Sequence, residues 1–197
     1  MAADRFRAVE GDGGPAVLVV VYGNRAFEDA LLELYDLAIE LGYIAVAGAA
    51  FIGEHSYSSP STPIANGRPD AEDLSLARTF GARVREKLKS AADLAGLPAP
   101  QIPGDRPYRS GWEPSTSAAT THPQLCTLCG CCAEVCPVAA ITIDSVVRTD
   151  VWACIPCNAC IRVCPTGARD VDDRHIQRIA QWLSTNFAER KSPETYL

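Results

Sequence analysis

Two cysteine motifs of the same spacing limit what this chain can fold into. Each follows the pattern C-x2-C-x2-C-x3-C-P. The first contains Cys126, Cys129, Cys132, Cys136 and Pro137, and the second contains Cys154, Cys157, Cys160, Cys164 and Pro165. All nine cysteines lie between residues 126 and 164. Thiolate chemistry is therefore confined to one segment, and the remaining residues must form a separate module.

The spacing of these motifs predicts iron–sulfur clusters. Two-residue gaps let one loop present three thiolates to three corners of an iron–sulfur cube, whereas the cysteine after the three-residue gap cannot reach the fourth corner. In this arrangement the fourth cysteine binds the other cluster. We therefore expect two [4Fe-4S] clusters. Cluster 1 would be held by Cys126, Cys129, Cys132 and Cys164, and cluster 2 by Cys154, Cys157, Cys160 and Cys136.

Crossed ligands would let the clusters replace a hydrophobic core that this short segment cannot supply. Residues 140–144 alternate like a strand, and residues 146–151 are expected to return beside it as a hairpin. Trp152, next to Cys154, would shield a cluster from water or fill a gap. Small side chains leave room for backbone amides near the cluster sulfurs. They are Gly130, Ala133, Ala159 and Gly167.

Zinc is the alternative metal, because a structural zinc site also takes four tetrahedral thiolates. A zinc-binding interaction module does not need a third cysteine in each motif or a repeated Cys-Pro, so the pattern favours iron. Cys131 is left outside both ligand sets, and we interpret it as an unligated thiol in the cluster loop.

Charge and hydropathy exclude other function classes. The net charge is -6 and the sequence pI is about 5.1, whereas a nucleic-acid partner requires a basic stripe. The longest strongly apolar run, residues 16–22, is too short to cross a bilayer, and the first residues do not resemble a signal peptide. We therefore expect a cytoplasmic protein with reduced cysteines that binds neither nucleic acid nor membranes.

The residues before the cysteines alternate between strand and helix patterns. The apolar run 16–22 predicts a buried parallel strand, residues 28–41 a helix that stops at Gly42, and residues 43–52 a second strand. A further helix should begin at Pro69. This order predicts a parallel sheet. Two strands are too few for a sheet, so the edge of 16–22 should pair with missing strands or with another copy in a homo-oligomer.

These patterns divide the chain into four parts. We predict an α/β domain over residues 1–92, a proline-rich extended linker over 93–123, a two-cluster domain over 124–171, and a C-terminal helix and tail over 172–197. The linker prediction depends on six prolines between residues 97 and 123. The helix prediction depends on apolar residues at helical spacing between Asp172 and Arg190.

The cysteine segment resembles the bacterial-type two-[4Fe-4S] ferredoxins. Residues 20–29, 51–58, 67–70 and 103–108 resemble the flavodoxin–ferredoxin fusion family, found largely in anaerobic bacteria and archaea. The resemblance implies a partial flavodoxin-like α/β domain with parallel strands, joined to a small α+β ferredoxin-like domain. It also implies that the chain begins partway through the flavodoxin-like domain, with residues 1–9 as the tail of a preceding helix.

This resemblance further implies an FMN site. The loop bordering the isoalloxazine ring would contain Tyr22, Gly23, Asn24 and Arg25, and the loop after the next strand would contain Glu54, His55 and Ser56. The phosphate-binding loop of such domains is absent from the sequence. An ordinary turn at Gly23 and Asn24, with Arg25 paired to Glu28 or Asp29, is therefore the alternative interpretation.

Two functions fit these patterns. The first is an electron-transfer protein whose two [4Fe-4S] clusters relay single electrons between redox partner proteins, with no catalytic residue. The acidic charge suits attraction to basic patches on such partners. The second is a fragment or subunit of an FMN-containing oxidoreductase, in which a flavin accepts two electrons and passes them on one at a time.

Overall fold

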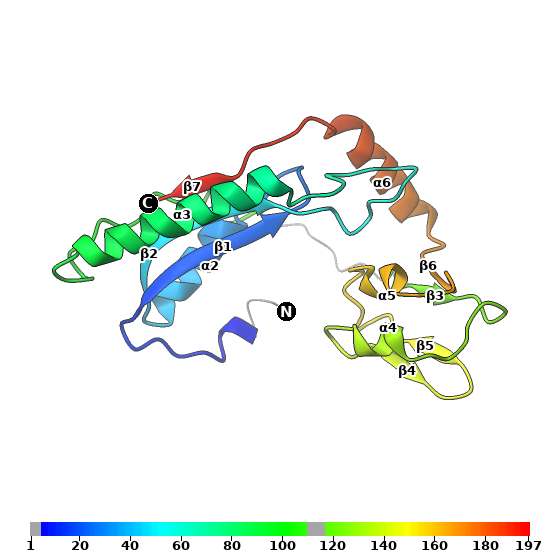
Figure 1. Cartoon of the computed structure of the whole chain (residues 1–197). Coiled ribbons are helices and arrows are strands. Elements are labelled where there is room, and N and C mark those ends of the chain that lie inside the picture. Colours follow the sequence, from blue (N-terminus) through cyan, green and yellow to red (C-terminus); the bar gives the residue numbers. More distant parts are fainter. Residues whose placement is uncertain (1–4, 110–116) are drawn as a thin grey trace. The chain divides into compact units, whose positions relative to one another are not determined.

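The computed structural model describes residues 5–109 and 117–197 and divides the chain into two units (Figure 1). The first unit contains residues 5–55, 65–109 and 189–197, and the second contains residues 56–64 and 117–188. Each unit therefore combines segments that are distant in the sequence. None of the helices in the described part of the chain has the length and apolar character needed to cross a membrane.

The first unit contains a three-stranded sheet. Strand β1 (Pro15–Tyr22), helix α2 (Ala30–Glu40), strand β2 (Ile44–Ile52) and helix α3 (Ala71–Ser90) follow one another along the chain. β1 and β2 pair in parallel, as the strand and helix order predicts. The third strand, β7 (Glu194–Tyr196), pairs antiparallel with the other edge of β2. The sequence patterns did not predict this strand.

The two helices pack on opposite faces of the sheet (Figure 1). Leu31 and Ala38 of α2 contact a cluster that includes Leu18 of β1, whereas Phe80 and Val84 of α3 contact β2. Helix α2 is followed by Gly42, whose positive φ of 86° reverses the chain.

A capping box starts helix α3. The Asp70 side chain accepts bonds from the amides of Glu72 and Asp73, and the Asp73 side chain accepts the Asp70 amide. The helix therefore begins one residue after its cap, close to the predicted start at Pro69.

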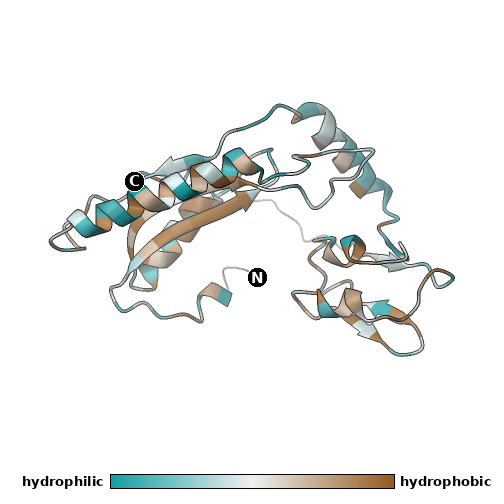
Figure 2. Ribbon diagram, viewed as in Figure 1, coloured by the Kyte–Doolittle hydropathy of each residue, from teal (hydrophilic) through white to brown (hydrophobic). Residues whose placement is uncertain are grey.

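Strand β1 is more exposed than the sequence predicts. Val17, Val19 and Val21 are 43%, 44% and 66% exposed, although the strand is strongly hydrophobic (Figure 2). Only Leu18 of this strand is buried, whereas nearly all of β2 is buried. The core on the α3 side is built on β2. The prediction of a strand covered on both faces is therefore wrong for β1, because helix packing, not the apolar run itself, decides which strand is covered.

Residues 98–109 of the predicted linker form neither helix nor strand and are bound to the first unit. Residues 117–123 were wrongly assigned to the linker, because they belong to the second unit and contain strand β3 (Thr120–Thr121). Ile102 packs in the α2 core, and a Cβ on Gly48 would lie only 2.5 Å from its side chain. Arg106 donates two bonds to the Asp36 carboxylate at 2.8 and 2.6 Å, and the Tyr108 hydroxyl donates a third at 2.5 Å. Residues 110–116 of the linker prediction, and residues 1–4 of the helix-tail prediction, lie outside the described residues.

A buried ion pair joins the start of α3 to the C-terminal segment. The Arg68 and Asp73 side chains are only 6% and 1% exposed, and the guanidinium donates to both carboxylate oxygens. Hydrogen bonding from Arg68 is the main cause of the lowered pKa of Asp73. Arg68 also donates to the Lys191 carbonyl at 3.0 Å. The pair therefore connects residues that are more than a hundred positions apart in the chain.

The second unit contains both cysteine motifs. Strands β3 (Thr120–Thr121) and β6 (Arg169–Asp170) pair antiparallel, as do β4 (Ile141–Ile143) and β5 (Val147–Thr149). The β4–β5 pair confirms the predicted hairpin. Two short helices, α4 (Cys131–Glu134) and α5 (Ala159–Arg162), lie within the motifs.

Helix α6 (Arg174–Asn186) lies inside the predicted range of the final helix. It buries Ile176, Ala180 and Leu183, and it packs against Ile64 from the segment 56–64. This segment follows β2 in the sequence but belongs to the second unit. The predicted helix is therefore confirmed, and its packing partner comes from a distant part of the chain.

We expect Asp73→Ala to lower the free energy of unfolding by about 3–5 kcal/mol, because it leaves the buried Arg68 cation without its carboxylate. Urea unfolding followed by far-ultraviolet circular dichroism measures the change. Glu72→Ala is the matched control, since its carboxylate is 72% exposed and pairs at the surface with Arg190. It should cost less than about 1 kcal/mol. Equal unfolding midpoints for the two variants would contradict this account.

Candidate metal centre

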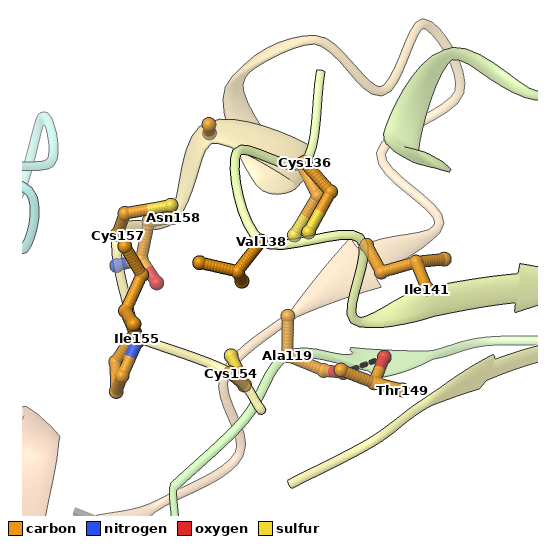
Figure 3. Close-up of a pocket in the computed structure, with 12 residues that line it drawn as sticks. Ala119, Cys136, Val138, Ile141, Thr149, Cys154, Ile155, Cys157 and Asn158 are labelled. Atoms are coloured by element: carbon orange, nitrogen blue, oxygen red, sulfur yellow. Dashed lines mark hydrogen bonds between the residues drawn. The ribbon is translucent and has the colours of Figure 1, made fainter. Parts of the chain in front are cut away.

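Two cavities in the second unit are lined by cysteines from both motifs. The first cavity contains Cys154, Cys157 and Cys160 of the second motif together with Cys136 of the first (Figure 3). The second cavity contains Cys164 of the second motif together with cysteines of the first. These are Cys126, Cys129, Cys131 and Cys132. The structure thus brings together the four cysteines expected for each cluster and adds Cys131 to one set.

The two motifs share left-handed residues at two pairs of equivalent positions. Gly130 and Asn158 occupy equivalent positions before α4 and α5, with positive φ values of 88° and 58°. Ala139 and Gly167 are also equivalent, with φ values of 51° and 64°. These left-handed residues turn each loop back on itself, so the repeat in the sequence is partly a repeat in conformation. It breaks at Leu128, whose φ is 55°, because the equivalent residue is Pro156.

The last cysteine of each motif accepts a backbone amide. Ala140 N donates to Cys136 Sγ and Ala168 N donates to Cys164 Sγ, both at 3.2 Å. The residue types at these positions have small side chains, which lets the amide approach the sulfur. Such bonds stabilise a negatively charged sulfur and tune the potential of a cluster bound to it.

The pKa values of the thiols differ between buried and open positions. Burial raises the pKa of Cys132 and of Cys154, and at Cys132 the charge of Arg169 opposes this effect. At Cys164 burial raises the pKa, but hydrogen bonds from the Thr166 side chain and from backbone amides lower it by more. The pKa of Cys164 is therefore lowered overall. Metal binding requires thiolates, so the cation and these amides favour the form that binds metal.

Cys131 contacts a neighbouring cysteine. Its backbone amide and its side chain both hydrogen-bond to Cys129 and lower the pKa of the Cys129 thiol. The same side-chain bond raises the pKa of Cys131. This pattern makes Cys131 a hydrogen-bond donor to Cys129, and its interpretation as an unligated thiol stays a prediction.

The donor chemistry of both cavities fits an iron–sulfur cube. The cysteines in both cavities offer sulfur, the soft ligand that iron–sulfur clusters require. Val138, Ile141 and Ile155 give the first cavity an apolar lining. In residues 5–109 and 117–197, no three His, Cys, Asp or Glu side chains are close enough to hold one metal ion. In a cube each cysteine binds a different iron, so the thiolates need not converge on a single point.

Trp152 does not take either of its expected roles. Its side chain is 82% exposed, so it neither fills a gap nor lies over a cavity. The backbone around it is held by Asp150, whose Oδ1 accepts the Trp152 amide at 2.9 Å and the Ala153 amide at 3.3 Å. Cys154 N donates to the Asp150 carbonyl at 3.0 Å. The turn therefore positions Cys154 while the indole ring faces outward.

The residues expected to bind FMN lie in the first unit and contact the C-terminal segment. Asn24 is 3% exposed, and its Nδ2 donates to the Glu189 carbonyl at 2.7 Å while its Oδ1 accepts the Lys191 amide at 3.3 Å. Lys191 Nζ donates to the Arg25 carbonyl at 2.5 Å. The Arg25 guanidinium pairs with Glu28 at 2.9 Å, as the alternative interpretation predicts.

Gly23 and Tyr22 are likewise covered by the protein's own side chains. A Cβ on Gly23 would lie 2.2 Å from the His55 ring, and the Tyr22 ring packs against Phe27 with centroids 5.4 Å apart. Glu54 Oε2 accepts the Gly67 amide at 3.2 Å. Because internal contacts occupy the described groups of this loop, the arrangement does not fit a flavin site.

Comparison with known families assigns the second unit. Residues 119–177 match the family described as the 4Fe-4S dicluster domain. These residues form a ferredoxin-like iron–sulfur domain. The match contains both cysteine motifs and extends from the residue before β3 into α6. No curated protein matches the chain. The iron–sulfur domain binds 4Fe-4S clusters, and the matched residues contain both cysteine cavities.

Sequence reasoning missed one residue of this domain. Arg169 is only 4% exposed and donates to Cys160 Sγ at 3.5 Å. Its signal in the sequence is a break in the repeat. The fifth residue after the last cysteine is Ile141 in the first motif and Arg169 in the second. A charged residue at the position of a buried isoleucine indicates a site worth testing.

Asn158→Val should reduce the iron content of the domain. Valine at a positive φ costs about 1–2 kcal/mol, which would distort the loop that presents Cys157 and Cys160. Asn158→Gly is the matched control, because glycine adopts this conformation freely and stands at the equivalent position, Gly130, of the first motif. Iron per chain after anaerobic reconstitution measures the effect. The same iron content in both variants would show that the left-handed turn is dispensable.

Proposed function

We propose that this protein relays single electrons between redox partner proteins through two [4Fe-4S] clusters. One observation carries the proposal: each cysteine cavity combines three cysteines of one motif with the last cysteine of the other. The proposed ligands of cluster 1 are Cys126, Cys129, Cys132 and Cys164. Those of cluster 2 are Cys154, Cys157, Cys160 and Cys136.

The residues around the cavities suit electron transfer without bond chemistry. A bound cluster would supply one-electron redox chemistry. The apolar side chains of Val138, Ile141 and Ile155 limit the access of water, and the amides of Ala140 and Ala168 stabilise charge on the sulfurs. These contributions are burial, hydrogen bonding and orientation, which are what a protein provides to an electron-carrying centre.

The charge of the chain supports basic redox partners. Its net charge is -6, and a cluster held by four thiolates adds further negative charge. Complementary charge accelerates encounter more than it strengthens a complex. We therefore expect the rate of electron exchange with a basic partner protein to fall as the salt concentration rises.

We infer that the first unit is a partial flavodoxin-like domain. Its parallel β1–β2 pair, with α2 and α3 on opposite faces, supports this class. In the described residues, β1 has no strand on its second edge. An open edge with exposed valines favours pairing with a further strand or with another copy of the chain.

Anaerobic purification tests the proposed function. We expect iron and acid-labile sulfide in equal amounts, a paramagnetic signal of [4Fe-4S] clusters after reduction, and no flavin released on denaturation. Zinc in place of iron and sulfide would support an interaction module instead. Released FMN would support the FMN-containing oxidoreductase.

Cys136→Ser should remove much of one cluster although Cys136 belongs to the opposite motif. We expect roughly half of the iron and sulfide to be lost, together with the reduced-state signal of cluster 2. Cys131→Ser is the matched control, because Cys131 lies outside both proposed ligand sets. It should keep the full iron content. If Cys136→Ser removes cluster 1 and spares cluster 2, the crossed assignment is wrong.

A further inference from the structure

Arg169 is a buried cation that contacts both cysteine cavities. It lines the cavity that contains Cys126 and Cys164, and its Nη2 donates to Cys160 Sγ of the other cavity at 3.5 Å. Two threonine hydroxyls fix the guanidinium: Nη1 donates to Thr121 Oγ1 at 2.7 Å, and Nη2 donates to Thr149 Oγ1 at 2.9 Å. These bonds hold the charge between the two proposed cluster sites.

Within the part of the chain that the structure describes, the charge of Arg169 has no carboxylate partner. In residues 5–109 and 117–197, no Asp or Glu forms an ion pair with it, and its buried Nε has no hydrogen-bond partner. Arg68, the other buried arginine, is instead paired with Asp73. Burying a cation without a counter-charge is unfavourable. The negative charge that would compensate Arg169 is that of thiolate-bound clusters.

The repeat indicates that this cation is a specific addition. Ile141 occupies the equivalent position after the first motif and is 8% exposed. An apolar residue therefore satisfies the packing of this position in one half of the domain. Arg169 introduces a charge where packing alone does not require one, and it does so beside Cys160.

We propose that Arg169 is a positioning residue that favours reduction of the two clusters. This inference rests on the proposed function. On reduction, each cluster accepts one electron from a one-electron donor and becomes more negative by one charge. The guanidinium keeps its proton in both states, so no proton is taken up at Arg169. Its charge stabilises the reduced state of both clusters, and its bond to Cys160 adds to this effect at cluster 2.

A redox titration of the cluster-loaded protein, followed by electron paramagnetic resonance, tests this role. Dithionite serves as the electron donor. At the potential where wild-type clusters are half reduced, Arg169→Gln should lower the ratio of reduced to oxidised clusters about tenfold, or about 59 mV for one electron. Arg169→Lys keeps the positive charge but loses the several N–H donors of the guanidinium. Its ratio of reduced to oxidised clusters should therefore lie between those of the wild type and Arg169→Gln.

Arg148→Gln is the matched control. Arg148 lies on β5 of the same domain, but its side chain is 62% exposed and pairs with Asp144 at 3.0 Å. We expect its ratio to stay within about twofold of the wild type, because solvent screens an exposed charge.

The outcomes separate this inference from the proposed function. A wild-type protein without iron, sulfide or the reduced-state signal would overturn the proposed function. The role of Arg169 alone would be overturned by a different result. The wild type would contain reducible clusters, and a fully loaded Arg169→Gln would have a ratio of reduced to oxidised clusters within about twofold of the wild-type ratio. If Arg169→Gln does not load clusters, Arg169→Lys decides. A ratio of reduced to oxidised clusters in Arg169→Lys that equals or exceeds that of the wild type would then reject the inference.

Discussion

The second unit depends on the exchange of one cysteine between its two halves. Cys136 enters the cavity of the second motif, and Cys164 enters that of the first. The secondary structure around them is slight, with helices of four residues and strands of two or three. Few large apolar side chains are buried there. Bonds from crossed cysteines to bound clusters would supply the long-range connections that a hydrophobic core provides elsewhere.

The two halves share several backbone features and differ in charge. Equivalent left-handed residues and equivalent amide–sulfur bonds build each cysteine loop in the same way. The repeat breaks where Arg169 replaces the counterpart of Ile141. In the first unit a buried arginine is balanced by Asp73, whereas beside the cysteines Arg169 donates to Cys160 Sγ and, in our proposal, bound clusters would balance its charge. The same residue type thus serves structure in one unit and redox chemistry in the other.

The C-terminal segment occupies polar groups of the loop that resembles a flavin site. Residues 189–197 return to the first unit, where Glu189 and Lys191 bind Asn24, and β7 extends the sheet. The Arg68–Asp73 pair holds the same segment through the Lys191 carbonyl. Groups at the end of two strands that could face a ligand are used to hold the chain's own backbone.

Local patterns were sufficient to predict the main strands and helices, the β4–β5 hairpin and the cysteine sets that meet in each cavity. These features depend on spacing and on residue type within a few positions. Tertiary structure decided the rest. The exposure of β1 depends on where α3 packs, and the burial of Arg169 depends on Thr121 and Thr149. The pairing of β7 depends on contacts such as that of Gly48 with Tyr196, which are far apart in the sequence. Each of these is set by contacts between residues far apart in the sequence, which no local periodicity records.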